Sequence, residues 1–395
     1  MKKASLKDSL RFQIPLFTLI RLIASTAYRM VYPFLPAFRD GLGVPIETLT
    51  PAIGSRSLVA AFAGPLFASL GDSRGRRTGM LMGIALFILG TAVVVFWPTF
   101  PGFVIALMLT TVGKVTFDPS MQAYLGDRVP YERRSFAITF TELSWSGAYI
   151  LGIPLIGWVI ARSGWITPFP LLGLLIMFAG AIVLWAVPRD PAHETKRPNL
   201  VTTYRTVLQS PPALAAIGFT FFSCIANEII NLVFGVWMEG SFGLQLAALG
   251  AAAAVLGVAE LAGEGLVATI TDRLGKRRAI FIGLVVNSVA VLSLPLMRGS
   301  LTGALVNLFI FYISFEFLIV SAIPLMTEVL PAARASMMAG FFTSASIGRA
   351  AASLFTPALY TLGFGITVAA AALMNLLALF SIRGLNLPSE VAAEA

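Results

Sequence analysis

The stretch "GDSRGRR" at residues 71–77 directly follows a long apolar run, and the chain repeats this arrangement as "TDRLGKRR" at residues 271–278. The two stretches align at an offset of 200 residues, which pairs Asp72 with Asp272. A charged turn that recurs at this distance in an apolar chain indicates two copies of one structural unit.

The composition indicates a chain that lies in a membrane. Hydrophobic residues make up 57% of the 395 residues and charged residues only 12%, whereas a soluble protein of this length needs far more surface charge. A spanning helix needs about 20 apolar residues, and the apolar runs lack the polar–apolar alternation of membrane β-barrels. We therefore predict an all-α membrane protein with twelve transmembrane helices, over 12–38, 49–70, 78–97, 102–125, 135–161, 166–187, 212–238, 246–270, 279–297, 301–327, 335–360 and 362–381.

A second repeat supports a division into two halves. The stretch "GDRVPYERRSFA" (126–137) follows the fourth apolar run, and "TEVLPAARASMM" (327–338) follows the tenth at an offset of 201 residues. A charged, Pro-rich stretch at 188–212 separates the first six runs from the last six. Parallel halves of this kind predict a pseudo-twofold axis along the membrane normal with a site between the halves. We expect an N-terminal six-helix bundle over 1–187, a cytoplasmic linker over 188–211 and a C-terminal six-helix bundle over 212–395.

The basic residues predict the orientation. Of the 28 Lys and Arg residues, twenty fall on one side of the predicted spans, and only Arg39, Arg162 and Arg298 fall on the other. This asymmetry predicts cytoplasmic termini. It also accounts for the net charge of +9 through contact with anionic lipid, so we expect no nucleic-acid partner. No cleavable signal peptide is evident, and we expect a multi-pass protein of the plasma (inner) membrane.

Two rare residues limit the chemistry. The single cysteine, Cys224, lies inside an apolar run, and the single histidine, His193, lies in the polar stretch between the halves. This excludes a disulfide framework and disfavours histidine-based catalysis or metal binding. The sequence also has no phosphate-binding P-loop, so we expect neither an enzyme nor an ATP-driven pump, and no cofactor or resident metal.

With its twelve apolar runs and its repeated charged turn, the chain resembles the major facilitator superfamily. The family signature between the second and third helices is Gly-x-x-x-Asp-Arg-x-Gly-Arg-Arg. The first copy matches it at Asp72, Gly75, Arg76 and Arg77. It departs from the signature at Ala68, which replaces the first glycine, and at Ser73, which replaces the first arginine. The second copy again has alanine, Ala268, at the first glycine. The resemblance implies that this pattern latches the halves closed on the cytoplasmic side, while a turn that only fixes topology is the simpler alternative. The resulting cytoplasmic gate comprises Asp72, Gly75, Arg76, Arg77, Asp127, Asp272, Arg273, Gly275 and Lys276.

Ionisable residues within the predicted spans are the candidates for function. Such residues are costly in a membrane and therefore face a cavity or a partner. At about 1.5 Å per helical residue, Arg21, Asp118, Glu260 and Glu316 come out near the bilayer midplane. The candidates for proton coupling or for the substrate cavity are the acids Asp118, Glu142, Glu228, Glu260, Glu264 and Glu316 and the cations Arg21, Lys114 and Arg349.

Our hypothesis is that one or more of these acids takes up and releases a proton as the halves rock. Asp118, which lies one helical turn from Lys114 and which we expect opposite Arg21, is the first choice. Glu316 and the Glu260/Glu264 pair come next. A purely structural Lys114–Asp118 ion pair is the alternative, and structural contacts are equally open for Glu142, Glu228 and Arg349.

The sequence favours export of small amphipathic or drug-like molecules. The fifth span, "GAYILGIPLIGW" (147–158), resembles the Gly-Pro-x-x-Gly-Gly element of drug–proton antiporters, with Ile153 inserted and Trp158 in place of the last glycine. The fourth span keeps Gly113 but has Leu109 where those exporters have arginine. The alternatives are import of an organic anion by proton symport, through Arg21, Arg29, Lys114 and Arg349, and a non-transporting scaffold or intramembrane enzyme. We expect a monomer, because one chain contains both halves.

Overall fold

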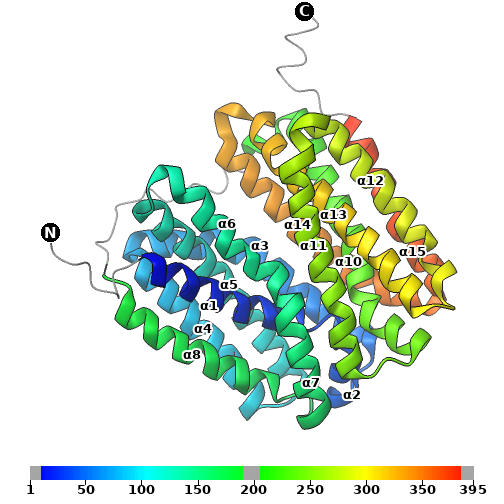
Figure 1. Cartoon of the computed structure of the whole chain (residues 1–395), viewed down its shortest axis with the longest axis horizontal. Coiled ribbons are helices and arrows are strands. Elements are labelled where there is room, and N and C mark those ends of the chain that lie inside the picture. Colours follow the sequence, from blue (N-terminus) through cyan, green and yellow to red (C-terminus); the bar gives the residue numbers. More distant parts are fainter. Residues whose placement is uncertain (1–9, 190–204, 384–395) are drawn as a thin grey trace, which may run out of the picture. The chain divides into compact units, whose positions relative to one another are not determined.

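The computed structural model describes residues 10–189 and 205–383, except for the side chains of 64–74, 131, 132, 135 and 332. The described residues form helices and connecting turns and contain no strand, which confirms the predicted all-α class (Figure 1). Ten of these helices are long and apolar enough to cross a membrane. In the described ranges, each of the twelve predicted spans coincides with one helix or with a short run of helices.

The chain folds into two compact units. The first unit contains Met1–Pro45, Phe62–Arg197 and Leu244–Gly257, and the second contains Ile46–Ala61, Pro198–Gly243 and Val258–Ala395. The twelve-helix, two-bundle layout is therefore present. The beginning of α3 (Ile46–Arg74) is assigned to the second unit and the beginning of α11 (Leu246–Leu274) to the first. The predicted boundaries at 187 and 212 stay a prediction.

The helices of the first unit pack around α1, α4, α5 and α8, which run side by side in Figure 1. Both α1 and α4 contact α5 and α8. α4 and α5 approach each other closely, because a Cβ on Gly113 would lie 2.6 Å from the carbonyl oxygen of Gly83. Small residues at such crossings let helix backbones pack tightly within a membrane. The elements are α1 (Leu10–Arg29), α2 (Leu35–Leu42), α3 (Ile46–Arg74), α4 (Arg76–Phe96), α5 (Phe100–Arg128), α6 (Tyr131–Gly147), the π-helix η2 (Ala148–Gly152), α7 (Ile153–Ser163) and α8 (Pro168–Ala186).

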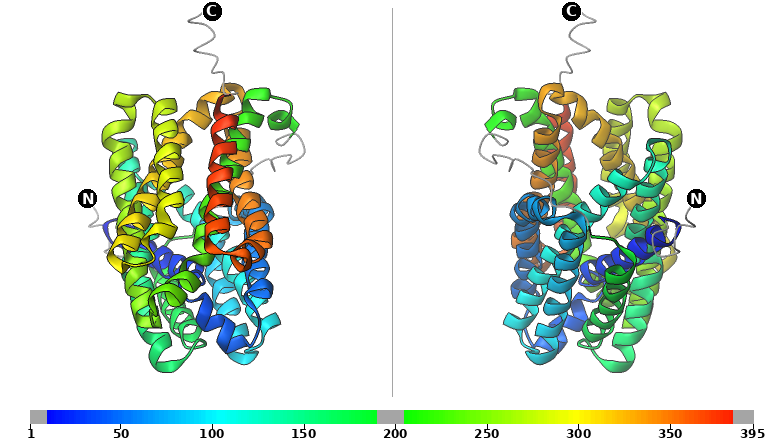
Figure 2. Two further views of the ribbon diagram at one scale, coloured as in Figure 1. Left: turned by 90° about the vertical axis from the view of Figure 1, so that its right-hand side faces the viewer. Right: turned by 90° about the vertical axis from the view of Figure 1, so that its left-hand side faces the viewer.

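The helices of the second unit pack around α10, which contacts α13, α14 and α15. The left view of Figure 2 shows α14 (orange) and α15 (red) side by side. The elements are α10 (Pro211–Phe242), α11 (Leu246–Leu274), α12 (Lys276–Ser293), the 3-10 turn η3 (Leu294–Met297), α13 (Leu301–Val329), the 3-10 turn η4 (Pro331–Ala333), α14 (Arg334–Leu362) and α15 (Phe364–Arg383).

The two repeated turns have the same backbone geometry. Gly75 separates α3 from α4 with φ 95°, and Gly275 separates α11 from α12 with φ 82°. Glycine adopts positive φ without the steric penalty that a Cβ brings, so both positions suit the tight reversal that the sequence predicts. The repeat in sequence is therefore a repeat in local structure.

The antiporter-like stretch contains an irregular helix. α6 passes into the π-helix η2 at Ala148–Gly152 and continues as α7, whose second residue is Pro154. Single π-helical turns within α-helices occur frequently at functional sites. Gly152 packs directly against the side chain of Thr26 in α1, where a Cβ would clash. This segment thus holds α1 and the α6–α7 run in close contact within the first unit.

Candidate functional site

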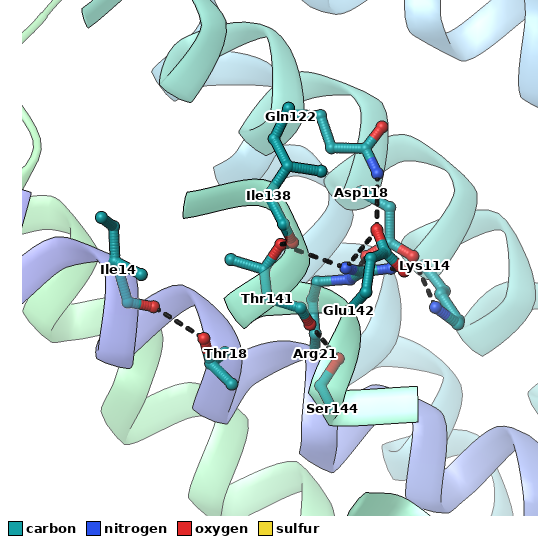
Figure 3. Close-up of polar contacts among 10 residues, drawn as sticks. All are labelled: Ile14, Thr18, Arg21, Lys114, Asp118, Gln122, Ile138, Thr141, Glu142 and Ser144. Atoms are coloured by element: carbon teal, nitrogen blue, oxygen red, sulfur yellow. Dashed lines mark hydrogen bonds and ion pairs between the residues drawn. The ribbon is translucent and has the colours of Figure 1, made fainter. Parts of the chain in front are cut away.

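Arg21 is the centre of a buried ionic network in the first unit (Figure 3). Its guanidinium contacts both carboxylate oxygens of Glu142, with Nη1 to Oε1 at 2.8 Å and Nη2 to Oε2 at 2.9 Å. Nη1 also donates to the Thr141 hydroxyl at 3.3 Å. A two-pronged arginine–carboxylate contact is strong and fixes the orientation of both groups. It therefore ties α1 firmly to α6.

Asp118 joins α5 to the same network. Its Oδ1 lies 3.3 Å from Nε of Arg21, and its Oδ2 accepts a 2.5 Å hydrogen bond from Nζ of Lys114. Gln122, one turn further along α5, donates to Oε1 of Glu142 at 3.0 Å. The structure thus brings together Arg21 and Asp118, which the sequence places on different helices. We name these residues — Arg21, Lys114, Asp118, Gln122, Thr141 and Glu142 — the Arg21 network.

The charges of the Arg21 network balance. Two cations face two carboxylates, and the side chains of Arg21, Lys114 and Asp118 are only 6%, 11% and 17% exposed. Glu142 is the most open member at 39%. Buried charges are tolerated when they are paired and hydrogen-bonded in this way. Any change in the protonation of one carboxyl group therefore disturbs a closely balanced cluster.

Arg29 lies near this network and contacts aromatic rings. Its guanidinium carbon sits 3.7 Å from the ring centre of Trp145 and 4.2 Å from that of Tyr149. Nζ of Lys114 lies 5.6 Å from the same Trp145 ring. Cation–π contacts of this kind stabilise a cation without neutralising it. Trp145 therefore lies against both Arg29 and Lys114.

A second polar network, the Glu228 network, lies in the second unit. The Glu228 side chain is 1% exposed, and its Oε2 accepts from Nη1 of Arg349 at 2.9 Å and from Nδ2 of Asn231 at 3.3 Å. Asn231 Nδ2 also donates to Oδ1 of Asn227 at 3.0 Å, and the hydroxyl of Tyr312 donates to Oδ1 of Asn231 at 2.6 Å. The network joins α10 to α13 and α14 within this unit.

Arg349 determines which atoms donate and which accept hydrogen bonds in the Glu228 network. Arginine only donates, so its 3.4 Å contact identifies the accepting atom of Asn227 as the amide oxygen. Asn231 must then present its NH₂ group to Asn227, which leaves its oxygen for Tyr312. The amide nitrogen of Asn227 consequently remains a buried donor without a hydrogen-bond partner among the described residues. A buried donor of this kind is costly and rare in native structures.

The remaining predicted acids lie together on α11 and α13. Glu260 and Glu316 are buried, and Glu264 is half-buried. A Cβ on Gly263 would lie 2.7 Å from Cβ of Glu316, so the α11 turn that carries Glu260 and Glu264 packs directly on Glu316. The structure thus brings these three acids into one region of the second unit.

The repeated turns form matching ion pairs. Nε of Arg76 lies 3.4 Å from Oδ2 of Asp127 in the first unit, and Lys276 pairs with Glu328 in the second. Asp127 and Glu328 occupy equivalent positions at the offset of 201 residues. Each pair joins two helices of its own unit. The role of these residues as a cytoplasmic gate remains a prediction.

The other predicted gate residues have different surroundings. Nη2 of Arg77 donates to the carbonyl oxygen of Leu184 in α8 at 2.6 Å. Asp272 and Arg273 are exposed. The Asp72 side chain lies outside the described residues. No group of three or more His, Cys, Asp and Glu residues in the described part of the chain is arranged to hold a metal ion.

Sequence reasoning missed several members of these clusters. Glu328 could have been found, because it stands in the quoted repeat at the position equivalent to Asp127. Gln122 also had a signal, because it lies one helical turn beyond Asp118 on α5. Thr141, Asn227, Asn231 and Tyr312 had none, since uncharged polar residues occur throughout these spans and only the helix packing selects them.

The family model described as Major Facilitator Superfamily matches residues 17–353, which is most of the chain. The chain belongs to the major facilitator superfamily. It is therefore a membrane transporter rather than an enzyme, as the sequence predicts.

Individual relatives within the superfamily are distant. An MFS-type transporter of Bacillus subtilis, YwfA, is 25% identical over 285 residues, which cover 71% of this chain and 69% of that protein. The multidrug resistance protein MdtG of Yersinia enterocolitica is 25% identical over 300 residues, covering 68% and 67%. A solved D-xylose–proton symporter matches with a TM-score of 0.75 at 17% identity, covering 94% of this chain and 97% of that one, and this likeness shows the fold alone.

Proposed function

We propose that this transporter exports small amphipathic or drug-like molecules in exchange for protons, and that Asp118 takes up and releases the proton. The observation that carries the proposal is the Arg21 network, in which one buried carboxylate contacts two cations on two helices. The multidrug resistance relatives support the substrate class and the direction of transport. Localisation in the plasma membrane, cytoplasmic termini and a monomeric state belong to the same proposal.

The coupling step follows from the charge balance. With Asp118 ionised, the two cations and two carboxylates of the network cancel. When Asp118 binds a proton, Arg21 and Lys114 face Glu142 alone, and one uncompensated positive charge remains in the membrane interior. That excess charge is costly, so the contacts that Arg21 makes with α5 and α6 become less favourable. Proton binding thereby shifts the population toward a different arrangement of these helices.

Other acids have secondary roles in this proposal. Glu316, Glu260 and Glu264 form the second candidate group for proton coupling, because they lie together on α11 and α13. Glu142 and Glu228 each hold an arginine and act as its structural partner. The buried amide nitrogen of Asn227, beside Arg349, offers a hydrogen bond to an acceptor group on the substrate.

The contacts favour export of amphipathic molecules over import of an organic anion. An anion carrier needs cations that can turn to the substrate, yet three of the four candidate cations are already engaged by carboxylates. Arg21 pairs with Asp118 and Glu142, Lys114 with Asp118, and Arg349 with Glu228. The fourth, Arg29, stacks on aromatic rings.

Accumulation of a fluorescent lipophilic cation, ethidium, in cells tests the proposal. We expect cells that express the wild-type protein to accumulate less ethidium than cells without it, and a protonophore should abolish the difference. Asp118→Asn should also abolish it. The matched control is Asp40→Asn, which removes an exposed carboxylate paired with its neighbour Arg39 and should retain export. Accumulation that is unchanged by the wild-type protein, or raised by it, would contradict export.

A further inference from the structure

A cavity of about 780 Å³ opens at the turn between α11 and α12 in the second unit. The first turn of α12 contributes Lys276, Arg277 and Arg278 to its lining, and the next turn contributes Phe281 and Ile282. The lining is thus cationic at one end of the helix and apolar one turn further along. By the distribution of basic residues, this end of the second unit faces the cytoplasm.

The apolar part of the lining continues along α12 as a stripe on one helix face. Residues four apart lie above one another on a helix, so Phe281, Val285 and Val289 follow Arg277, and Ile282 and Val286 follow Arg278. These five apolar side chains are 40–63% exposed. From Arg278 to Val289 the helix rises about 16 Å, which is close to the thickness of one leaflet of the hydrocarbon core. The stripe therefore has the length of a lipid acyl chain.

The charge at the head of the stripe is positive. Lys276 pairs with Glu328, so these two charges cancel within the lining. Asp272, Arg277 and Arg278 line the same cavity, so the remaining charged residues of the lining sum to one positive charge. Arginine matches phosphate oxygens with paired N–H groups better than lysine does.

The first copy of the repeat does not share this arrangement. Thr78 stands at the position equivalent to Arg278. The shared turn therefore does not account for Arg278, which stands at the head of the exposed apolar stripe.

We propose that this cavity binds one anionic phospholipid, with the phosphate held between Arg277 and Arg278 and an acyl chain along Phe281 and Val285. Charge complementarity selects the anionic headgroup, and the exposed stripe selects a lipid over a free phosphate. Lys276 and Glu328 line the same cavity, so the bound lipid lies directly against the predicted gate of the second unit.

The test is native mass spectrometry of the purified full-length protein in an uncharged detergent, titrated with dioleoyl phosphatidylglycerol. We expect the wild-type protein to retain one phosphatidylglycerol molecule, with much weaker retention of dioleoyl phosphatidylcholine. Arg277→Gln with Arg278→Gln should weaken the affinity for phosphatidylglycerol about thirtyfold, the loss expected for two arginines beside an anionic lipid. Arg278→Thr, which installs the residue of the first copy, should cause about a fivefold loss by the same reasoning.

The matched control removes the same charge from the predicted cytoplasmic side of the first unit. Arg128→Gln with Arg133→Gln alters two exposed arginines and should leave the affinity unchanged. Equal affinity in the wild type and in both Arg278 variants would overturn the proposal, as would equal retention of phosphatidylcholine. Full displacement of the lipid by equimolar glycerol 1-phosphate would also overturn it, because the site would then be one for a free phosphate.

Discussion

Arg21→Met removes the residue that joins three helices of the first unit. The side chain is 6% exposed and loses two contacts to Glu142 and one to Asp118. Removing one partner of a buried ion pair costs about 3–5 kcal/mol. We expect the lower end, about 3 kcal/mol, because Glu142 is partly exposed and Asp118 keeps Lys114.

A double-mutant cycle isolates the contact with Glu142. Glu142→Met alone should also destabilise the protein, because the buried Arg21 loses its two-pronged carboxylate contact and keeps Asp118 and the Thr141 hydroxyl. The double variant should be less destabilised than the sum of the two single variants, with a coupling free energy of about 1–2 kcal/mol. The matched control is the exposed pair Arg39–Asp40, for which we expect a coupling of about 0.5 kcal/mol or less.

The measurement is unfolding of the purified protein in mixed micelles of increasing SDS content, followed by circular dichroism. The midpoint should move to lower SDS in each single variant and recover partly in the double variant. If the effects of Arg21→Met and Glu142→Met add without coupling, the two side chains do not form the contact that the account requires. A stability equal to wild type in Arg21→Met would refute the network altogether.

Further predictions concern packing, the repeated turn and the cysteine. Gly113→Ala should lower the free energy of unfolding by about 1–3 kcal/mol, because the new Cβ would meet the carbonyl oxygen of Gly83 in α4. The control Gly126→Ala, on the same helix, meets nothing within 4 Å and should leave the midpoint of the same SDS assay unchanged. Glu328→Gln removes the ion pair with Lys276, and both side chains of this pair are partly exposed, so the free energy of unfolding should fall by about 1 kcal/mol or less. If the pair belongs to the gate, the same variant should change the initial rate of ethidium export. Cys224 is 1% exposed, so a maleimide followed by mass spectrometry should label it only after unfolding, and rapid labelling of the folded protein would contradict the packing of α10.

Most of the fold could be predicted because the membrane imposes a simple pattern. Backbone groups in lipid must be paired within a helix, so long apolar runs predict spanning helices directly. The repeats at 71–77 and 271–278 then align the two halves. What the pattern does not contain is irregularity within a span. The π-helix at Ala148–Gly152 and the separation of α1 from α2 depend on local packing and had no periodic signal.

The site was predictable to the extent that it is charged. Charged residues are rare in spans, so Arg21, Lys114 and Asp118 were visible in the sequence, and the spacing of four residues suggested one of their two contacts. The contact between Arg21 and Glu142 was not predicted, because it depends on how α1 packs against α6. Neutral residues such as Asn231 and Tyr312 were missed for the same reason.

The most direct test of the central claim is proton movement in proteoliposomes that contain a pH-sensitive dye, with ethidium added outside. The account predicts a substrate-dependent proton flux in the wild-type protein that persists in Asp40→Asn and is lost in Asp118→Asn. Glu316→Gln, measured in parallel, separates the second candidate group from the first. A proton flux in Asp118→Asn equal to that of the wild type would contradict the assignment of the proton to Asp118, and ethidium transport without any proton signal would contradict proton coupling itself.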